Sequence, residues 1–316
     1  MKPAAGSLFM SLLLLAGWPV AAAGPSAAAV PVFKSGVDLV TVSAIVRDQR
    51  GRMVTGLKAS DFEVLDAGMP RTIVQFRADR APASVALLID TSGSMEIADK
   101  IAQARVAATA LVDGLDQTQD ETAVYAFDTG LRTLQPFSPP RSLLSTFAAL
   151  KPYGATSLYD AIAQAARREA VRPVPHRAVV VFTDGLDNAS RLTPAQVSGL
   201  ASSIDVPIYV VAVVSPLDRA AVLGGGGKGS GVYATAAAAL ADLGRWTGGG
   251  LLVASSDDEM RVAMQRIVAD LHHQYLLAFT PGLPPGWHPL VIRTRNPRFT
   301  VDARGGYMAG GARPTS

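Results

Sequence analysis

Hydrophobic residues follow strand-like spacing in two parts of the chain, one toward each end. In residues 34–80, short runs rich in β-branched side chains, such as 37–46, predict β-strands. Few residues separate these runs, so parallel crossovers do not fit and an antiparallel sheet is expected. Three further strand-like runs lie at 274–279, 289–294 and 299–303. Because the strands of the first part are too few to close a sandwich easily, we predict that residues 34–80 and 274–305 form one small antiparallel β-sandwich.

The central region, residues 82–273, alternates between strand and helix patterns. Its nearly continuous apolar runs are typical of parallel strands that are covered on both faces. Residues 98–115 place apolar side chains on one face of a helix. This alternation predicts an α/β domain with a doubly wound, mostly parallel sheet, inserted between the two halves of the β-sandwich. The principal apolar runs lie at 84–89, 178–182 and 206–214, and further helices are expected at 142–150, 158–169, 193–203, 234–246 and 260–271.

The first 23 residues have the three-part plan of a secretory signal peptide. Lys2 precedes an apolar run, and small residues end at Ala23, after which cleavage is expected. A membrane anchor is the alternative, but the run contains Pro19 and is shorter than the roughly 20 residues that span a bilayer. No later run is long enough to cross a membrane. We therefore expect a secreted, periplasmic or cell-envelope protein without a transmembrane segment in the mature chain. Residues 306–316 are expected to form a flexible tail.

Composition narrows the classes of function. The 316 residues are 49% hydrophobic, which is enough for a substantial core, and the absence of cysteine excludes disulfides. The formal net charge is only +3 and the basic residues are scattered, so no nucleic-acid partner is expected. The four histidines lack the spacing of metal ligands, and the neighbours His272 and His273 are expected to cap a helix or lie on the surface.

Candidate metal-binding residues begin where an apolar, strand-like run ends at Asp90. Ser92 and Ser94 follow at alternate positions, so three oxygen side chains can converge between strand and loop. Asp184 follows another apolar, strand-like run. Oxygen ligands without Cys or His favour Mg2+, with Mn2+ or Ca2+ as alternatives, over Zn2+. Ligands of doubly wound sheets bind at the carboxyl ends of the strands, where both aspartates are expected.

The Asp-x-Ser-x-Ser pattern, the loop Thr and the later Asp stand in the order found in von Willebrand factor type A (VWA) domains. The chain resembles that family, and the resemblance implies an intact metal-ion-dependent adhesion site. It implies that Ser92 and Ser94 bind the ion directly, that Thr156 binds directly or through water, and that Asp90 and Asp184 hold waters and hydroxyls in place.

Two details refine the resemblance. Ala155 stands where the family more often has a second Gly, which affects the flexibility of the loop rather than a ligand. The segments Val-Thr-Gly-Leu at 54–57 and Asp-Phe-Glu-Val at 61–64 resemble those that precede the VWA domain in secreted bacterial VWA-related proteins.

The resemblance also implies a partner. Neutral hydroxyls offset little of the charge of the ion, which then accepts a further anionic oxygen. The expected partner is a protein that presents Asp or Glu to the metal and contacts the loops around Gly93, Ala155 and Gly185. Substitution of Asp184 by Ala is expected to remove this binding and to leave the fold largely intact. The alternative is a structural or assembly factor of the cell envelope whose β module makes the partner contacts.

Catalytic motifs fail on required residues, so no enzyme is expected. Asp90-Thr91-Ser92 lacks the Gly of the aspartic protease signature and the second Asp of Asp-x-Asp phosphatases, and no Gly-x-Ser-x-Gly sequence occurs. The glycine-rich run 224–231 lacks the first Gly and the final hydroxyl residue of a phosphate-binding loop. It is interpreted as a flexible loop near the metal site.

Overall fold

The computed structural model describes residues 39–310, apart from 79, 142–145, 147–149, 216–218, 220–229 and 283. The expected signal peptide and most of the predicted helix at 142–150 and of the glycine-rich run lie outside these residues. The central sheet consists of β5 (Ala83–Asp90), β6 (Glu121–Phe127), β7 (Leu131–Ser138), β8 (His176–Thr183), β9 (Ile208–Val213) and β10 (Gly250–Ala254). Its strand order is β10-β9-β8-β5-β6-β7, and every neighbouring pair is parallel except β6 and β7.

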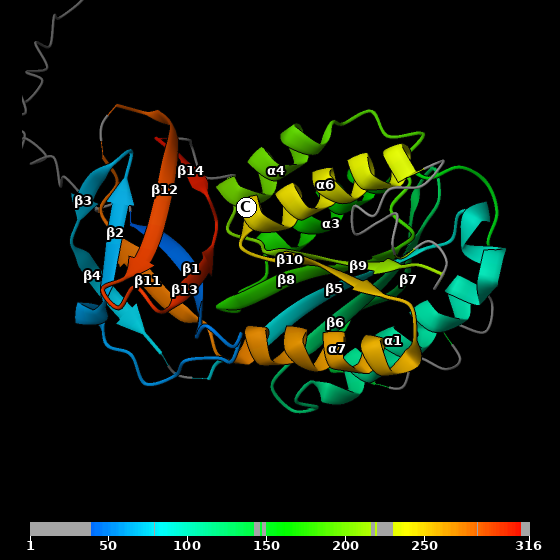
Figure 1. The fold of residues 1–316 in the computed structure, drawn as a ribbon, viewed down its shortest axis with the longest axis horizontal. Coiled ribbons are helices and arrows are strands. Elements are labelled where there is room, and N and C mark those ends of the chain that lie inside the picture. Colours follow the sequence, from blue (N-terminus) through cyan, green and yellow to red (C-terminus); the bar gives the residue numbers. More distant parts are fainter. Residues whose placement is uncertain are drawn as a thin grey trace, which may run out of the picture. The chain divides into compact units, whose positions relative to one another are not determined.

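Helices cover both faces of this sheet (Figure 1). One face carries α1 (Lys100–Gly114) and α7 (Asp257–His272), and the other carries α3 (Leu158–Ala170), α4 (Pro194–Ser203) and α6 (Ser230–Thr247). The central strand β5 shows why two layers form, because all of its side chains are buried and successive ones point to opposite faces. Val85, Leu87 and Ile89 join the core under α1 and α7, whereas Ala86 and Leu88 join the other core. The predicted α/β fold with a mostly parallel sheet is confirmed.

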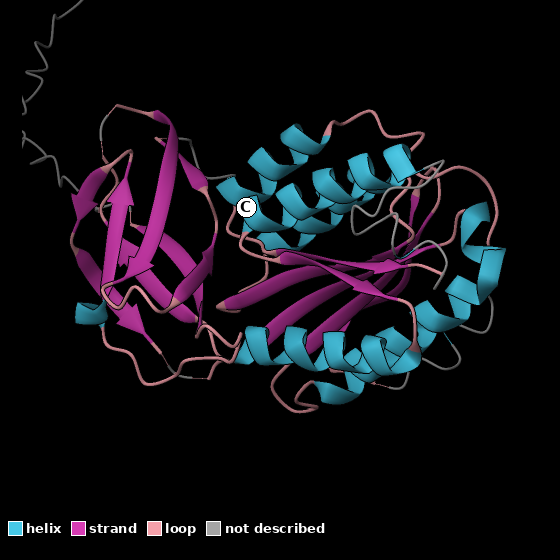
Figure 2. Ribbon diagram, viewed as in Figure 1, coloured by secondary structure: helices cyan, strands magenta, loops and turns pink. Residues whose placement is uncertain are grey.

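The chain ends supply two four-stranded antiparallel sheets (Figure 2). The strands are β1 (Val40–Arg47), β2 (Phe62–Asp66), β3 (Met69–Arg71), β4 (Ile73–Arg77), β11 (Tyr275–Phe279), β12 (Gly286–Thr294), β13 (Thr300–Ala303) and β14 (Gly306–Ala309). Their orders are β13-β1-β11-β4 and β14-β12-β2-β3, so each sheet mixes strands from both ends. A shared core that includes Val42, Phe62, Leu277 and Tyr307 lies between them. The antiparallel sheets expected from both ends of the chain are confirmed.

Local details of the sandwich differ from the prediction. The tail expected at 306–316 begins instead with β14, which pairs with β12, because the side chain of Tyr307 is buried in the sandwich core. Met53 forms an isolated antiparallel bridge with Arg47 of β1. The turn after β2 is confined to Ala67 and Gly68, both with positive φ, and Pro70 lies within β3.

Buried polar groups join the sandwich to the central domain. Arg304, which follows β13, is buried and donates to the carbonyl of Ser202 at the end of α4. Arg47 of β1 forms a buried ion pair with Asp270 of α7. Gly305 donates its N–H to the carbonyl of Trp246 at 2.9 Å, and the indole ring leaves no room for a Cβ at this glycine. None of the described helices is long and apolar enough to cross a membrane.

Candidate functional site

The carboxyl ends of β5 and β8 lie at one edge of the central sheet, where two of the predicted ligands stand. Asp90 is the last residue of β5 and is fully buried. Its Oδ1 accepts a hydrogen bond from the backbone N–H of Ser92 at 2.8 Å, and its Oδ2 accepts one from the Thr183 hydroxyl at 2.6 Å. Burial raises the pKa of Asp90 to about 6, and the charge of Asp184 adds to the shift. The ionised carboxylate of Asp90 is therefore destabilised unless a cation lies nearby.

The loop after β5 contacts the loop before α3. Beyond Asp90 the chain enters a 3-10 segment, η2 (Gly93–Asp99). The hydroxyls of Ser92 and Ser94 lie 3.3 Å apart. The N–H of Gly93 donates to the carbonyl of Gly154 at 3.0 Å. The first two segments of the predicted site are thus held together by a backbone hydrogen bond.

Thr156 connects the second segment to the third. Its side chain is buried, and its N–H donates to the Asn188 side chain at 2.8 Å. Asn188 in turn donates its own N–H to the Thr156 carbonyl at 3.1 Å. The N–H of Leu158 donates to Asp187 at 2.8 Å, which adds a further link to the loop after Asp184. All five predicted ligands therefore lie on three segments that contact one another.

A buried lysine, which the sequence analysis did not include, lies in the same site. The ammonium group of Lys100, the first residue of α1, donates to Asp184 Oδ2 at 2.9 Å. The two side chains are only 6% and 1% exposed. The other carboxylate oxygen, Asp184 Oδ1, is buried and has no hydrogen-bond partner among the described residues.

The burial of Lys100 has a sequence signal that is clear in retrospect. Lys100, Ala104, Ala107, Ala108 and Leu111 are all buried, and their spacing places the lysine on the apolar face of α1. A lysine at the start of a helix is ordinarily solvated, which is the opposite of what this spacing indicates.

The backbone before α1 adopts an unusual conformation that brings Lys100 to the sheet edge. Ala98 and Asp99 have φ values of 54° and 58°, which is the left-handed region. A non-glycine residue in the left-handed region raises the conformational free energy by about 1–2 kcal/mol relative to the right-handed region. The packing of the surrounding loops must therefore offset this strain.

The donor set suits a hard cation. Among the described residues, no three or more His, Cys, Asp or Glu side chains are grouped so that they could hold a metal. The sheet edge instead combines two carboxylates with three hydroxyls, which is the chemistry that Mg2+ and related ions accept. The unpartnered Asp184 Oδ1 is consistent with such an ion, since a buried carboxylate oxygen needs a donor or a cation.

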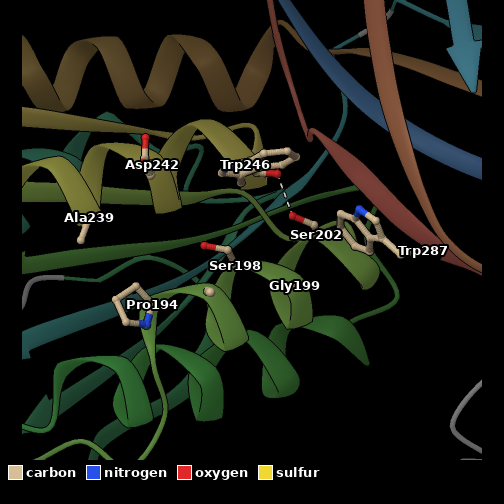
Figure 3. Close-up of a pocket in the computed structure, with 9 residues that line it drawn as sticks. Pro194, Ser198, Gly199, Ser202, Ala239, Asp242, Trp246 and Trp287 are labelled. Atoms are coloured by element: carbon tan, nitrogen blue, oxygen red, sulfur yellow. Dashed lines mark hydrogen bonds between the residues drawn. The ribbon is translucent and has the colours of Figure 1, made fainter. Parts of the chain in front are cut away.

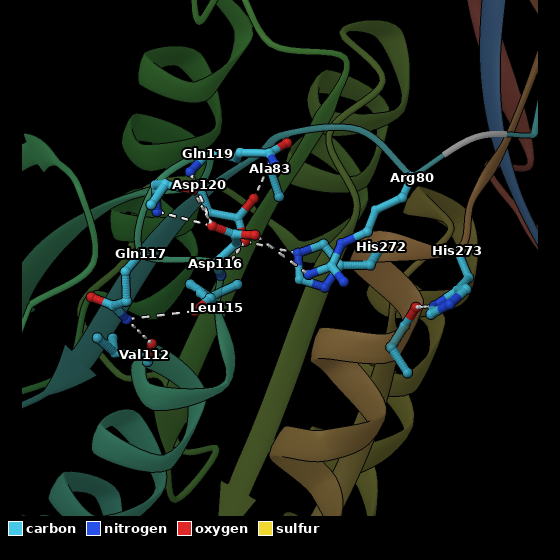
Figure 4. Close-up of polar contacts among 12 residues, drawn as sticks. Arg80, Ala83, Val112, Leu115, Asp116, Gln117, Gln119, Asp120, His272 and His273 are labelled. Carbon is cyan, nitrogen blue, oxygen red and sulfur yellow. Dashed lines mark hydrogen bonds and ion pairs between the residues drawn. The ribbon is translucent and has the colours of Figure 1, made fainter.

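The amino ends of the strands carry a different polar cluster (Figure 4). Asp120, just before β6, accepts hydrogen bonds from the N–H groups of Ala83 and Asp116 and contacts His272 Nε2 at 2.8 Å. His272 is buried at the end of α7, so the expectation of a capping or surface residue is wrong for it. Its exposed neighbour His273 does contact the carbonyl of Ala269, as a capping residue would. This cluster fixes the end of α7 at the edge opposite the candidate site.

A groove with a volume of about 460 Å3 separates α4 and α6 next to the sandwich (Figure 3). Pro194, Ser198 and Gly199 of α4 lie along it. Trp246 of α6 and Trp287 of β12 also line it, and they are 41% and 42% exposed. The groove does not include any of the five predicted metal ligands.

Comparison with known families identifies the class of the central domain. Residues 85–186 match the family model of the von Willebrand factor type A domain. The chain therefore contains a VWA domain, and the matched residues include Asp90, Thr156 and Asp184. No curated protein shows a significant sequence match to the chain.

Several solved structures are similar to parts of the chain. The conserved hypothetical protein BatB from Bacteroides thetaiotaomicron is 19% identical over 60% of this chain and 98% of its own, with a TM-score of 0.47. The PilB minor pilin from Streptococcus sanguinis is 13% identical over 61% of this chain and 62% of its own, with a TM-score of 0.45, so less than two thirds of the pilin is matched. A von Willebrand factor type A protein from Catenulispora acidiphila is 13% identical over 88% of this chain and 74% of its own, with a TM-score of 0.45.

Proposed function

We propose that this protein is a metal-dependent protein-binding module that acts outside the cytoplasm, and that it is not an enzyme. The observation that carries the proposal is that the three segments bearing Asp90, Ser92, Ser94, Thr156 and Asp184 contact one another at the carboxyl edge of a VWA domain. The predicted signal peptide at residues 1–23 supports a secreted, periplasmic or cell-envelope location.

The residues at the sheet edge have two different roles in binding the ion. Ser92, Ser94 and Thr156 supply hydroxyl oxygens to Mg2+, or to Mn2+ or Ca2+, and Asp90 and Asp184 hold waters and hydroxyls around it. The bound ion supplies a positive centre for an anionic oxygen. Because the three hydroxyls are neutral, a Glu or Asp side chain of a partner protein is the ligand of matching charge. The loops around Gly93, Ala155 and Gly185 surround this position and are the proposed contact surface.

Metal binding is tested first, without a partner. Isothermal titration of the purified protein with MgCl2 is expected to show one site, and Ser92→Ala is expected to weaken binding at least tenfold, or about 1.4 kcal/mol. Thr129→Ala is the matched control, since Thr129 is an exposed hydroxyl on the loop after β6 at the same sheet edge. Equal affinities of the wild type and Ser92→Ala would contradict the proposed ligand set.

Partner binding is tested in a second step. Immobilised protein is incubated with a cell-envelope extract in the presence of Mg2+ or of excess chelator. The bound proteins are expected to elute with chelator, and Ser92→Ala is expected to retain none of them. Recovery of the same proteins in excess chelator would contradict a metal-dependent contact.

A second candidate function is that of a structural or assembly factor whose β module makes the partner contacts. The exposed Trp246 and Trp287 favour it, because large aromatic residues in a groove are enriched at binding surfaces. Two variants distinguish the candidates. Thr156→Val is expected to abolish partner capture in the first case only, and Trp287→Ala in the second case only.

A further inference from the structure

Lys100 places a positive charge inside a site whose donor set suits a divalent cation. Its ammonium group lies 2.9 Å from Asp184 Oδ2, and both side chains are almost completely buried. Lys100 and a metal ion would therefore interact with the same carboxylate from within the same low-dielectric region. At such distances two positive charges repel each other strongly, because water does not screen them.

The two aspartates differ in the charge of the groups that donate hydrogen bonds to them. Asp90 accepts hydrogen bonds from neutral groups only, whereas Asp184 accepts one from the ammonium group of Lys100. Without Lys100 the two carboxylates would be buried close together with no cation. Lys100 offsets one of the two negative charges and so lowers the electrostatic cost of burying both carboxylates.

Lys100 occupies only one of the two carboxylate oxygens of Asp184. The other oxygen, Oδ1, is free of partners among the described residues. A divalent ion can therefore approach Oδ1 while Lys100 keeps Oδ2. The lysine then reduces the negative charge that attracts the metal, without closing the position.

We propose that Lys100 is a built-in counter-ion that competes electrostatically with the divalent cation, so that it weakens metal binding and stabilises the metal-free form. The proposal rests on the function proposed above, since it concerns the same site. In this proposal the charge of Lys100 replaces the ion in stabilising the fold, and it lowers the affinity of the site below that of the two aspartates alone. Occupancy of the site would then follow the concentration of the metal.

The test compares three full-length proteins by isothermal titration with MgCl2: the wild type, Lys100→Met and Lys151→Met. Methionine keeps the length of the lysine side chain and removes its charge. Lys151 is exposed in the stretch before Gly154, so its substitution removes a similar charge near the site without touching Asp184. Lys100→Met is expected to bind Mg2+ at least tenfold more tightly than the wild type, whereas Lys151→Met is expected to stay within about twofold, which is under 0.5 kcal/mol.

Thermal unfolding of the same proteins supplies a second readout. In excess chelator the melting temperature of Lys100→Met is expected to lie below that of the wild type, and saturating Mg2+ is expected to remove most of the difference. If Lys100→Met is poorly folded in chelator, it is purified in Mg2+ and Lys100→Gln is titrated in its place.

The outcomes separate the two proposals. An affinity of Lys100→Met equal to or below that of the wild type, in a wild type that binds Mg2+, overturns the role of Lys100 and leaves the metal site standing. Binding by Lys100→Met but not by the wild type supports both proposals. Absence of binding by every protein overturns both.

Discussion

Asp184→Ala is the natural first mutation at this site, and the structure changes what is expected of it. From sequence alone the variant should lose metal-dependent binding with its fold largely intact. In the folded protein, however, Asp184 is the hydrogen-bonded acceptor for the buried ammonium of Lys100. Alanine would leave that charge unpaired in the interior. Removal of one partner of a buried ion pair costs about 3–5 kcal/mol.

The size of the expected effect is easily measured. For domains of 150–250 residues, 1 kcal/mol corresponds to a change in melting temperature of about 2–4 °C, so Asp184→Ala is expected to lower it by about 6–20 °C. Chemical unfolding in chelator, followed by circular dichroism, gives the free energy directly. The double variant Asp184→Ala with Lys100→Met removes both charges and is expected to recover at least about 2 kcal/mol of the loss.

The double variant decides whether this reasoning is right. If it is no more stable than Asp184→Ala, the ammonium of Lys100 is not an uncompensated buried charge, and the cost assigned to it is wrong. Asp184→Asn serves as the control, since its amide oxygen can still accept a hydrogen bond from Lys100. Because Asp184→Ala is expected to destabilise the domain, a loss of partner binding in this variant does not show that a metal ligand is missing. Ser92→Ala is therefore preferred as the functional probe.

Three further predictions concern the rest of the fold. Asp270→Ala is expected to cost about 1.5–3 kcal/mol in chemical unfolding at about pH 8, because it removes the buried partner of Arg47 and leaves the guanidinium with the more exposed Asp302 at 3.4 Å. Asp270→Leu with Arg47→Met is expected to restore most of this loss. The pKa of His288 is raised above 6.5 by a backbone carbonyl and then by a carboxylate, so the stability it provides is complete below about pH 6.5 and is lost as pH rises through the raised value. His288→Gln should show no such decline between about pH 6 and pH 9 in urea unfolding. Gly305→Ala is expected to cost about 1–3 kcal/mol, seen as a lower melting temperature, because its Cβ would overlap the ring of Trp246.

The sequence predicted those helices and strands whose apolar side chains follow one clear periodicity. The strands β5 and β8 contain continuous apolar runs at 85–89 and 178–182. The strand β5 ends at Asp90, and Asp184 directly follows β8. Their order along the sheet could not be read from periodicity, but the rule that ligands bind at carboxyl ends predicted the correct edge for Asp90 and Asp184. What placed Asp90, Thr156 and Asp184 in one site was therefore the combination of a motif with a topological rule.

The elements that were missed depend on tertiary contacts. Tyr307 lies in a short segment rich in glycine that looked like a tail, and only pairing with β12 makes it a strand. Lys100 is buried against Asp184, which lies 84 residues further along the chain and accepts a hydrogen bond from its ammonium group. His272 is buried because Asp120, far away in the sequence, contacts its ring. In each case a partner distant in the chain decides the environment.

The strand order of the sandwich leads to a final prediction about fragments. β1 pairs with β11 and β13, and β4 pairs with β11, so neither strand has a neighbour from the same end of the chain. Among the described residues of the fragment 34–80, the short hairpin of β2 and β3 and the isolated bridge between Arg47 and Met53 keep their pairing. A lone hairpin is marginally stable at best in water. This fragment is therefore expected to show no cooperative unfolding.

Residues 82–273 present the opposite case, because they retain all six strands of the central sheet and the helices on both faces. This fragment is expected to unfold cooperatively, but at a lower denaturant concentration than the full chain, since Asp270 loses Arg47 and the ring of Trp246 loses its cover from Gly305. Denaturant titrations of both fragments and of the full chain make the comparison. A cooperative transition in residues 34–80 would mean that the N-terminal strands can pair in an arrangement other than the observed one. In that case the argument that these strands need the C-terminal strands as neighbours would be wrong.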